Sequence, residues 1–133
     1  MDTVMSIRLT DAVPANSEPT PLSDLVNAQL QEYFAGTRRE FDFSINPDGT
    51  AFQRLVWHAL LQIPFGETRT YGQIAASIGK PDAVRAVGSA CNRNPIWIVI
   101  PCHRVVGQGR NLTGYVGGLD MKRALLDLEK RHQ

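Results

Sequence analysis

Cysteine and long apolar runs are scarce in this sequence, and each shortage excludes a class of protein. The 133 residues include two cysteines, Cys91 and Cys102, too few for the disulfide framework of a small secreted domain. No stretch approaches the roughly 18 consecutive apolar residues that a membrane-spanning helix needs. The first residues lack the basic and apolar regions of a secretory signal. We therefore expect a cytoplasmic monomer with reduced thiols and no membrane association.

Patterns that bind metal ions are missing as well. The two cysteines and the three histidines, His58, His103 and His132, show no CxxC or HxxxH spacing, so we expect neither a metal nor a cofactor. The length and a hydrophobic content of 43% fit one compact unit, or a small domain attached to a lesser one.

Positive charge is unevenly distributed, although the net charge is only +1. Residues 1–50 carry three basic side chains against eight acidic ones. Residues 69–123 carry eight basic side chains against two acidic ones, a net charge of +6. Such a one-sided segment favours a polyanionic partner such as nucleic acid.

The first third of the chain predicts a small segment of mixed structure. Residues 11–21 contain three prolines, which indicates a loop. We expect a helix from the N-cap Ser23 to Gly36. Its expected buried stripe is Leu25, Val26, Leu30, Tyr33 and Phe34. Residues 41–45 alternate apolar and polar side chains, which predicts a half-buried strand. Residues 1–49 would thus form an N-terminal segment of loop, helix and strand, followed by a domain over residues 50–133.

Three helices are predicted between residues 50 and 92. Thr50 would cap the first, and its expected buried stripe is Phe52, Leu55, Val56, Ala59, Leu60 and Ile63. Thr70 and Gln73 have capping-box spacing at the start of the second helix. A tight turn at 79–81 leads to the third helix over residues 82–92.

The last two of these helices form a helix-turn-helix candidate. Small residues on the second helix of the pair would let it approach another surface closely, and they include Ala83, Ala86, Gly88 and Ser89. An ordinary tight helix pair explains the same pattern. Arg85, which projects from the helix, and Arg93 at its end favour contact with DNA.

The segment around Cys102 carries the clearest chemical signal. The apolar run 96–100 predicts a buried strand or extended segment, and Pro101 stiffens the turn that presents the thiol. A free thiol has a pKa near 8.5, so an adjacent base and a cation would increase its thiolate fraction. His103 and Arg104 are placed to do so. The plain alternative is a small core cysteine beside a surface histidine.

Glycines and a final helix complete the chain. The glycines at 107, 109, 114, 117 and 118 permit close approach of the backbone to a flat ligand. A last amphipathic helix is expected from Leu119 to Lys130. Its expected buried residues are Leu119, Leu125, Leu126 and Leu128.

Taken together, the segments from Thr50 to Glu129 resemble the O6-alkylguanine-DNA alkyltransferase family. Five blocks occur in the order of the family: Phe-Gly-Glu-Thr before Thr-Tyr-Gly, Arg-Ala-Val-Gly, Asn-Pro, Pro-Cys-His-Arg-Val and Tyr-Val-Gly-Gly-Leu. The resemblance implies an α/β fold with a mostly helical C-terminal domain, a winged helix-turn-helix-like motif and a reduced N-terminal α+β segment. It also implies DNA repair by base flipping, in which an alkyl group moves irreversibly from O6 of guanine in duplex DNA to the protein's own cysteine.

The resemblance also implies roles for individual residues. Cys102 corresponds to the alkyl acceptor, and His103 to the base that takes the thiol proton through a water. Glu129 would orient the imidazole. Asn94 would brace the turn before the active-site segment, and Tyr71 would donate a proton to the purine.

Further positions correspond to the DNA and guanine contacts of the family. Arg85 matches the arginine that fills the base stack after flipping, and Tyr115 would line the guanine pocket. Val105 and Val116 would bond the base edge through their backbones. Trp97 stands where family members more often carry a small residue or proline, which predicts a narrower pocket mouth.

Three other functions remain as alternatives. Alkyltransferase-like proteins bind alkylated DNA without repairing it, but they lack the acceptor cysteine that Cys102 supplies here. A Cys-His hydrolase would need an oxyanion pocket, for which the sequence gives no sign. A helix-turn-helix regulator would prefer one DNA sequence over a damaged base.

Overall fold

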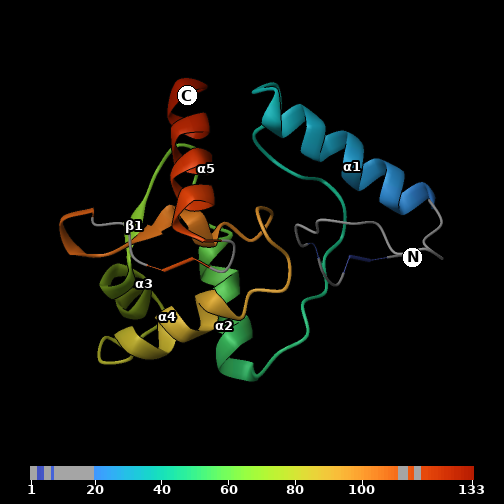
Figure 1. The fold of residues 1–133 in the computed structure, drawn as a ribbon. Coiled ribbons are helices and arrows are strands. Elements are labelled where there is room, and N and C mark those ends of the chain that lie inside the picture. The colour runs from blue at the N-terminus through green and yellow to red at the C-terminus, as the bar shows by residue number, and fades with distance from the viewer. Residues whose placement is uncertain (1–2, 5–6, 8–19, 111–113, 116–117) are drawn as a thin grey trace.

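The computed structural model describes residues 3–4, 7, 20–110, 114–115 and 118–133, and within these it is mostly helical (Figure 1). Its α-helices are α1 (Pro21–Phe34), α2 (Ala51–Leu60), α3 (Tyr71–Ser77), α4 (Val84–Asn92) and α5 (Leu119–Arg131). Two short strands, β1 (Arg69–Thr70) and β2 (Val105–Val106), form a parallel pair. The mostly helical architecture expected from the sequence is confirmed.

Helix α1 begins earlier than the sequence predicted. Thr20 is the N-cap, because its side chain accepts a hydrogen bond from the Ser23 backbone at 3.0 Å and Ser23 bonds back. Pro21 fits the first helical turn, where no backbone N–H is needed. The expected buried stripe is only partly right: Tyr33 is fully buried, but Phe34 is 45% exposed and Leu25 is also exposed. Helix α1 thus packs through a narrow face.

The strand expected over residues 41–45 is wrong. The chain there is extended, and among the described residues only Ile45 pairs with another segment, through a single bridge to Val4. Phe41 and Phe43 pack their rings against each other with centroids 5.8 Å apart. The alternating pattern therefore reflects side-chain packing along an extended chain, without a ladder of backbone hydrogen bonds.

Helices α2, α3 and α4 pack together as the core of the larger part of the molecule (Figure 1). The capping boxes at Thr50 and Thr70 are both present, as predicted. Trp57, which the predicted stripe omitted, is buried and donates its indole N–H to the Ala90 carbonyl at 2.9 Å. The start of α4 at Val84 is two residues later than expected, because residues 81–82 belong to the preceding turn.

The parallel strand pair fixes the entrance to α3 against the segment that carries Cys102. Arg69 pairs with Val105 and Thr70 with Val106. The apolar run 96–100 is no strand, although Ile96, Ile98 and Ile100 are buried in alternation as an extended segment would bury them. The segment before α3 and the segment after α4 are thereby held side by side.

Helix α5 buries polar side chains where an ordinary amphipathic helix buries leucines. Its buried residues are Lys122, Leu125 and Glu129, which share one face by their spacing. Leu119, expected in the core, is exposed. The C-terminal ends of α5 and α1 meet, and Arg39 after α1 donates to the His132 carbonyl at 2.7 Å (Figure 1). Within the described part of the chain, every helix is too short or too polar to cross a membrane.

Candidate active site and nucleic-acid interface

Cys102 opens a 3₁₀ turn (Cys102–Arg104) directly after Pro101, and its side chain is only 2% exposed. Its sulfur accepts a hydrogen bond from Asn94 Nδ2 at 3.1 Å, and its S–H points to the Cys91 carbonyl at 3.4 Å. Burial raises the pKa of the Cys102 thiol, and the neighbouring Cys91 adds to the rise. The Asn94 hydrogen bond and the charge of Lys122 oppose it without reversing it. The thiol therefore keeps its proton in the protein without DNA.

Asn94, just after α4, holds the whole segment that leads to Cys102. Its Nδ2 also donates to the Ile100 carbonyl at 2.9 Å, and its Oδ1 accepts from the Ile96 backbone at 2.9 Å. One buried amide thus joins both ends of the 96–102 segment, which has no strand partner over most of its length. These are the contacts that a bracing residue needs.

His103 and Glu129 form a buried pair between the 3₁₀ turn and α5. The distance from His103 Nε2 to Glu129 Oε2 is 2.6 Å. An ionised carboxylate only accepts hydrogen bonds, so the imidazole carries its proton on Nε2. Nδ1 is then the basic nitrogen, and it has no hydrogen-bond partner among the described residues. Burial lowers the pKa of His103, although the Glu129 carboxylate opposes this, so the ring is neutral and able to take a proton.

Glu129 accepts hydrogen bonds from five donors. Its Oε1 accepts from Arg104 Nε at 2.8 Å and from the Gly66 backbone at 3.1 Å. Its Oε2 accepts from His103, from Arg104 Nη2 at 3.0 Å and from the Tyr33 hydroxyl at 2.6 Å. Burial alone would raise the pKa of Glu129, but its contacts with His103 and Arg104 outweigh this and hold it well below its usual range. The carboxylate is therefore ionised at neutral pH.

Arg104 does not act on the thiol. Its guanidinium contacts Glu129, donates to the Ile63 carbonyl at 2.7 Å and lies over the Phe65 ring at 5.7 Å. The expectation that Arg104 would help to ionise Cys102 is therefore wrong. Adjacency in the sequence misled here, because successive side chains of a turn point in different directions.

Lys122 is a component of the site that the sequence analysis missed. It is fully buried, and its Nζ lies 3.4 Å from the Tyr71 hydroxyl, 3.3 Å from the Gly114 carbonyl and 5.6 Å from the centre of the Tyr71 ring. Burial lowers the pKa of Lys122, while the two thiols Cys91 and Cys102 oppose this. Its spacing of seven residues from Glu129 was the available signal.

The remaining predicted pocket residues differ in burial and in their contacts. Tyr115 is buried, its ring meets the His103 ring edge to face at 6.5 Å, and its hydroxyl has no partner in the described part of the chain. Val105 is buried in β2 and Trp97 is half-buried against the core. Val116 lies outside the described residues.

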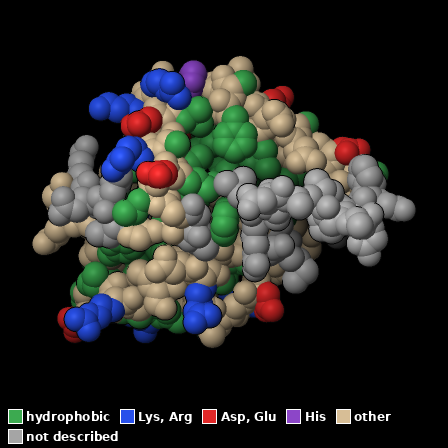
Figure 2. Space-filling model, in the orientation of Figure 1, with side chains coloured by type: hydrophobic (Ala, Val, Ile, Leu, Met, Phe, Trp, Pro, Cys, Tyr) green, Lys and Arg blue, Asp and Glu red, His purple; other side chains and the backbone are tan. Residues whose placement is uncertain are grey.

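Helix α4 divides into a buried face and an exposed face. Val87, Ala90 and Cys91 face the core. The exposed positions carry the predicted DNA contacts Arg85, Ala86, Ser89 and Arg93, with Ala83 and Gly88 half-buried beside them. A Cβ on Gly88 would lie 4.0 Å from the Tyr71 ring, so the packing would tolerate a larger residue there. Figure 2 shows several basic side chains along the lower edge of the molecule, the edge that α4 occupies in Figure 1.

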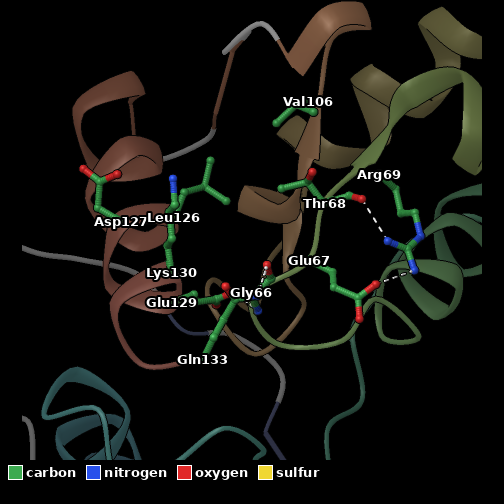
Figure 3. A pocket seen from close by; sticks show the side chains of 10 residues that line it. All are labelled: Gly66, Glu67, Thr68, Arg69, Val106, Leu126, Asp127, Glu129, Lys130 and Gln133. Carbon is green, nitrogen blue, oxygen red and sulfur yellow. Dashed lines mark hydrogen bonds and ion pairs between the residues drawn. The ribbon is translucent and has the colours of Figure 1, made fainter.

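A separate cavity of 460 Å³ reaches Glu129 from the loop 66–69 and the end of α5 (Figure 3). Its walls include Arg69, which pairs with Glu67 at 3.1 Å, and Val106 of β2. Its ten lining residues do not include Cys102 or His103. It is therefore not the space in which an alkyl group would meet the thiol.

A family model matches residues 51–131, which is more than half of the chain. The model describes the 6-O-methylguanine DNA methyltransferase, DNA binding domain. The chain belongs to this family. The matched range contains every predicted site residue, from Tyr71 to Glu129.

Individual relatives agree with the methyltransferase family. A methylated-DNA–protein-cysteine methyltransferase of Methanosarcina acetivorans is 60% identical over 101 residues, which are 76% of this chain and 65% of that protein. The chain thus spans slightly less than two thirds of that relative.

Solved structures give the same picture. A crystal structure of Mycobacterium tuberculosis OGT in complex with DNA is similar with a TM-score of 0.87 and 49% identity, over 96% of this chain and 81% of that one. S. pombe Atl1 in complex with damaged DNA is similar with a TM-score of 0.54 and 30% identity, over 59% of this chain and 74% of that one.

One contributor to this methyltransferase-family site lies outside the matched range. Tyr33 comes from α1, yet its hydroxyl lies 2.6 Å from Glu129 Oε2. The sequence placed Tyr33 in a buried stripe but gave no sign of its partner, which follows 96 residues later.

Proposed function

We propose that this protein repairs DNA by taking an alkyl group from O6 of guanine onto Cys102, once per molecule. The observation that carries the proposal is the arrangement of Cys102, held by Asn94 at 3.1 Å, next to a histidine whose far nitrogen is bonded to a buried carboxylate at 2.6 Å. Nucleophile, base and orienting acid are the three parts that thiol activation requires. The methyltransferase relatives support the same chemistry.

The transfer begins with the thiol proton. It passes from Cys102 to His103 Nδ1, through a water as the family resemblance implies, and the Glu129 carboxylate stabilises the imidazolium that forms. The sulfur then attacks the alkyl carbon in line with the bond to O6. As the S–C bond forms, the C–O6 bond breaks and its electron pair stays on the guanine.

Tyr71 completes the transfer by donating its hydroxyl proton to the purine ring, which makes the guanine a better leaving group. Lys122, 3.4 Å from that hydroxyl, favours the phenolate that remains. The thioether product is stable, because its alkyl carbon is unactivated and a thiolate is a poor leaving group from it. Each molecule therefore acts once.

Duplex DNA is the proposed partner. Helices α3 and α4 would form a helix-turn-helix-like motif that binds the duplex. The exposed face of α4 is built from small residues, with Arg85 near its start and Arg93 just after its end. Flipping a base costs a few kcal/mol, and less when alkylation has weakened the pair. Arg85 would stack in the vacated position and recover part of that energy. Tyr115, with the backbones of Val105 and Val116, would hold the extruded guanine, and Trp97 would narrow the pocket mouth.

Transfer of a labelled methyl group tests this proposal. A duplex with O6-methylguanine should pass its label to the protein in a single burst equal to the amount of protein. Cys102→Ala should bind the duplex and take no label. Continued turnover after the burst would point to a hydrolase, and binding without transfer by the wild type would point to a non-catalytic binder such as an alkyltransferase-like protein.

A further inference from the structure

The hydroxyl of Tyr33 lies inside the His103–Glu129 pair, although Tyr33 belongs to α1 and precedes the matched domain. It is 2.6 Å from Glu129 Oε2 and 3.5 Å from His103 Nε2, and the side chain is fully buried. Burial, with the Glu129 charge as the next cause, raises the pKa of Tyr33, so the hydroxyl stays protonated. It therefore donates a hydrogen bond to the Glu129 carboxylate.

Packing does not account for this hydroxyl. The Tyr33 ring lies 5.6 Å from the ring of Phe34, 5.7 Å from that of Phe41 and 6.1 Å from that of Phe65. A phenylalanine would keep all three contacts. A buried hydroxyl costs free energy unless it is hydrogen-bonded, so its presence here follows from the carboxylate that it contacts.

The Tyr33 hydroxyl shares Oε2 of Glu129 with His103. Tyr33, His103 and Arg104 all donate to Oε2, so the hydroxyl restricts the position in which the ionised carboxylate meets the imidazole. The Tyr33 hydroxyl further draws part of the charge of Oε2 away from the ring. Without it, the carboxylate would act more strongly on the ring and favour the protonated imidazole, which cannot take the thiol proton.

We propose that Tyr33 is a positioning residue of the alkyl transfer. Its hydroxyl holds the Glu129 carboxylate so that His103 keeps its proton on Nε2 and offers Nδ1 to the thiol. The inference rests on the function proposed above. It makes α1, part of the N-terminal segment, a contributor to the chemistry of the family domain.

The effect should be visible in the pH dependence of the reaction. The charged and titratable groups around His103 are Glu129 and Lys122 of α5, Arg104 and Cys102 of the 3₁₀ turn, Tyr115, and Tyr33 of α1. Replacing Tyr33 by phenylalanine changes only the last of these. The carboxylate then acts more strongly on the ring, and the pKa of His103 rises. The acid limb of the rate profile should move to higher pH.

Single-turnover methyl transfer by the full chain, measured across pH, tests the inference. For Tyr33→Phe we expect a rate about tenfold lower at pH 7, by analogy with the lower end of the loss when a hydrogen-bond partner that orients a metal-bound histidine is removed. The acid limb of the pH–rate profile should shift to higher pH. Thr37→Val is the matched control, because it removes a hydroxyl just after α1 that donates to the Glu32 carbonyl at 3.1 Å. It should leave the rate and its pH dependence unchanged.

The outcomes separate this inference from the function on which it rests. A wild-type protein that transfers methyl, with Tyr33→Phe matching its rate and pH profile, overturns the role of Tyr33 alone. A wild-type protein that transfers nothing refutes the function itself. Should Tyr33→Phe not fold, ¹⁵N spectra of wild-type His103 decide the matter. We expect a protonated Nε2 and a Tyr33 hydroxyl proton protected from exchange, and an Nδ1–H tautomer overturns the inference.

Discussion

The two halves of the site differ sharply in how well their polar groups are bonded. On one side, the Glu129 carboxylate accepts five hydrogen bonds and fixes the orientation of His103. On the other side, the hydroxyl of Tyr115 and Nδ1 of His103 have no partner among the described residues, and Cys102 has one side-chain donor. The base is thus preorganised by the protein, whereas the groups on the thiol side keep bonding capacity that, in the proposed mechanism, a water and the guanine would use.

Removal of the Glu129 charge should have the largest effect. Glu129→Gln leaves Arg104 buried and unpaired, which typically costs about 3–5 kcal/mol of unfolding free energy. Glu67→Gln is the matched control, because it breaks an exposed pair with Arg69 and should cost less than about 1 kcal/mol. Urea denaturation measures both. Equal losses of unfolding free energy would show that the buried Glu129 contacts stabilise the protein no more than the exposed Glu67–Arg69 pair.

Acid should weaken the same half of the site. The depressed pKa of Glu129 adds stability that is present above the unfolded-state pKa and is lost as pH falls below it. The lowered pKa of His103 acts in the same direction, because the unfolded chain takes up this proton first, near pH 6.5. The unfolding free energy should therefore fall as pH decreases from 7 to 4. Glu129→Gln should flatten the lower part of this slope, and an unchanged slope would contradict the assignment.

One chemical change made in both halves sharpens the comparison. Tyr33→Phe removes a hydroxyl bonded to a carboxylate, and we expect a loss of about 1.5–3 kcal/mol in unfolding free energy. Tyr115→Phe removes a buried hydroxyl without a described partner, and it should change the stability by less than about 0.5 kcal/mol or increase it. Thermal or urea unfolding of the two variants gives the result directly.

The smallest expected effect concerns the nucleophile. Lys122→Met removes the buried cation that lowers the pKa of Cys102, so the thiol should react with a small alkylating reagent about twofold more slowly at pH 8. Lys130→Met, on the exposed side of the same helix, should react like the wild type. An equal rate in both variants would show that Lys122 does not affect the reactivity of the Cys102 thiol.

Local signals in the sequence were reliable where the structure they predict is local. The capping boxes at Thr50 and Thr70 fix the starts of α2 and α3, as three-residue patterns should. The strand over residues 41–45 failed because alternation shows which side chains are buried but not whether a neighbouring strand is available.

The chemistry of the site was harder to predict, because it depends on contacts across long separations. The motif around Cys102 predicted a nucleophile and its base, but the bonds that Glu129 accepts come from three separate parts of the chain. Lys122 and Tyr33 were missed for that reason. The direction of the thiol's pKa was missed because burial cannot be read from neighbouring residues.

Peptide mapping by mass spectrometry, after the protein is mixed with an O6-methylguanine duplex, tests the central claim most directly. The proposed mechanism predicts one methyl group per molecule, on Cys102 and not on Cys91, which is also buried, with no further repair once the protein is consumed. An unmodified Cys102 beside repaired DNA, or a methyl group on Cys91, would contradict it.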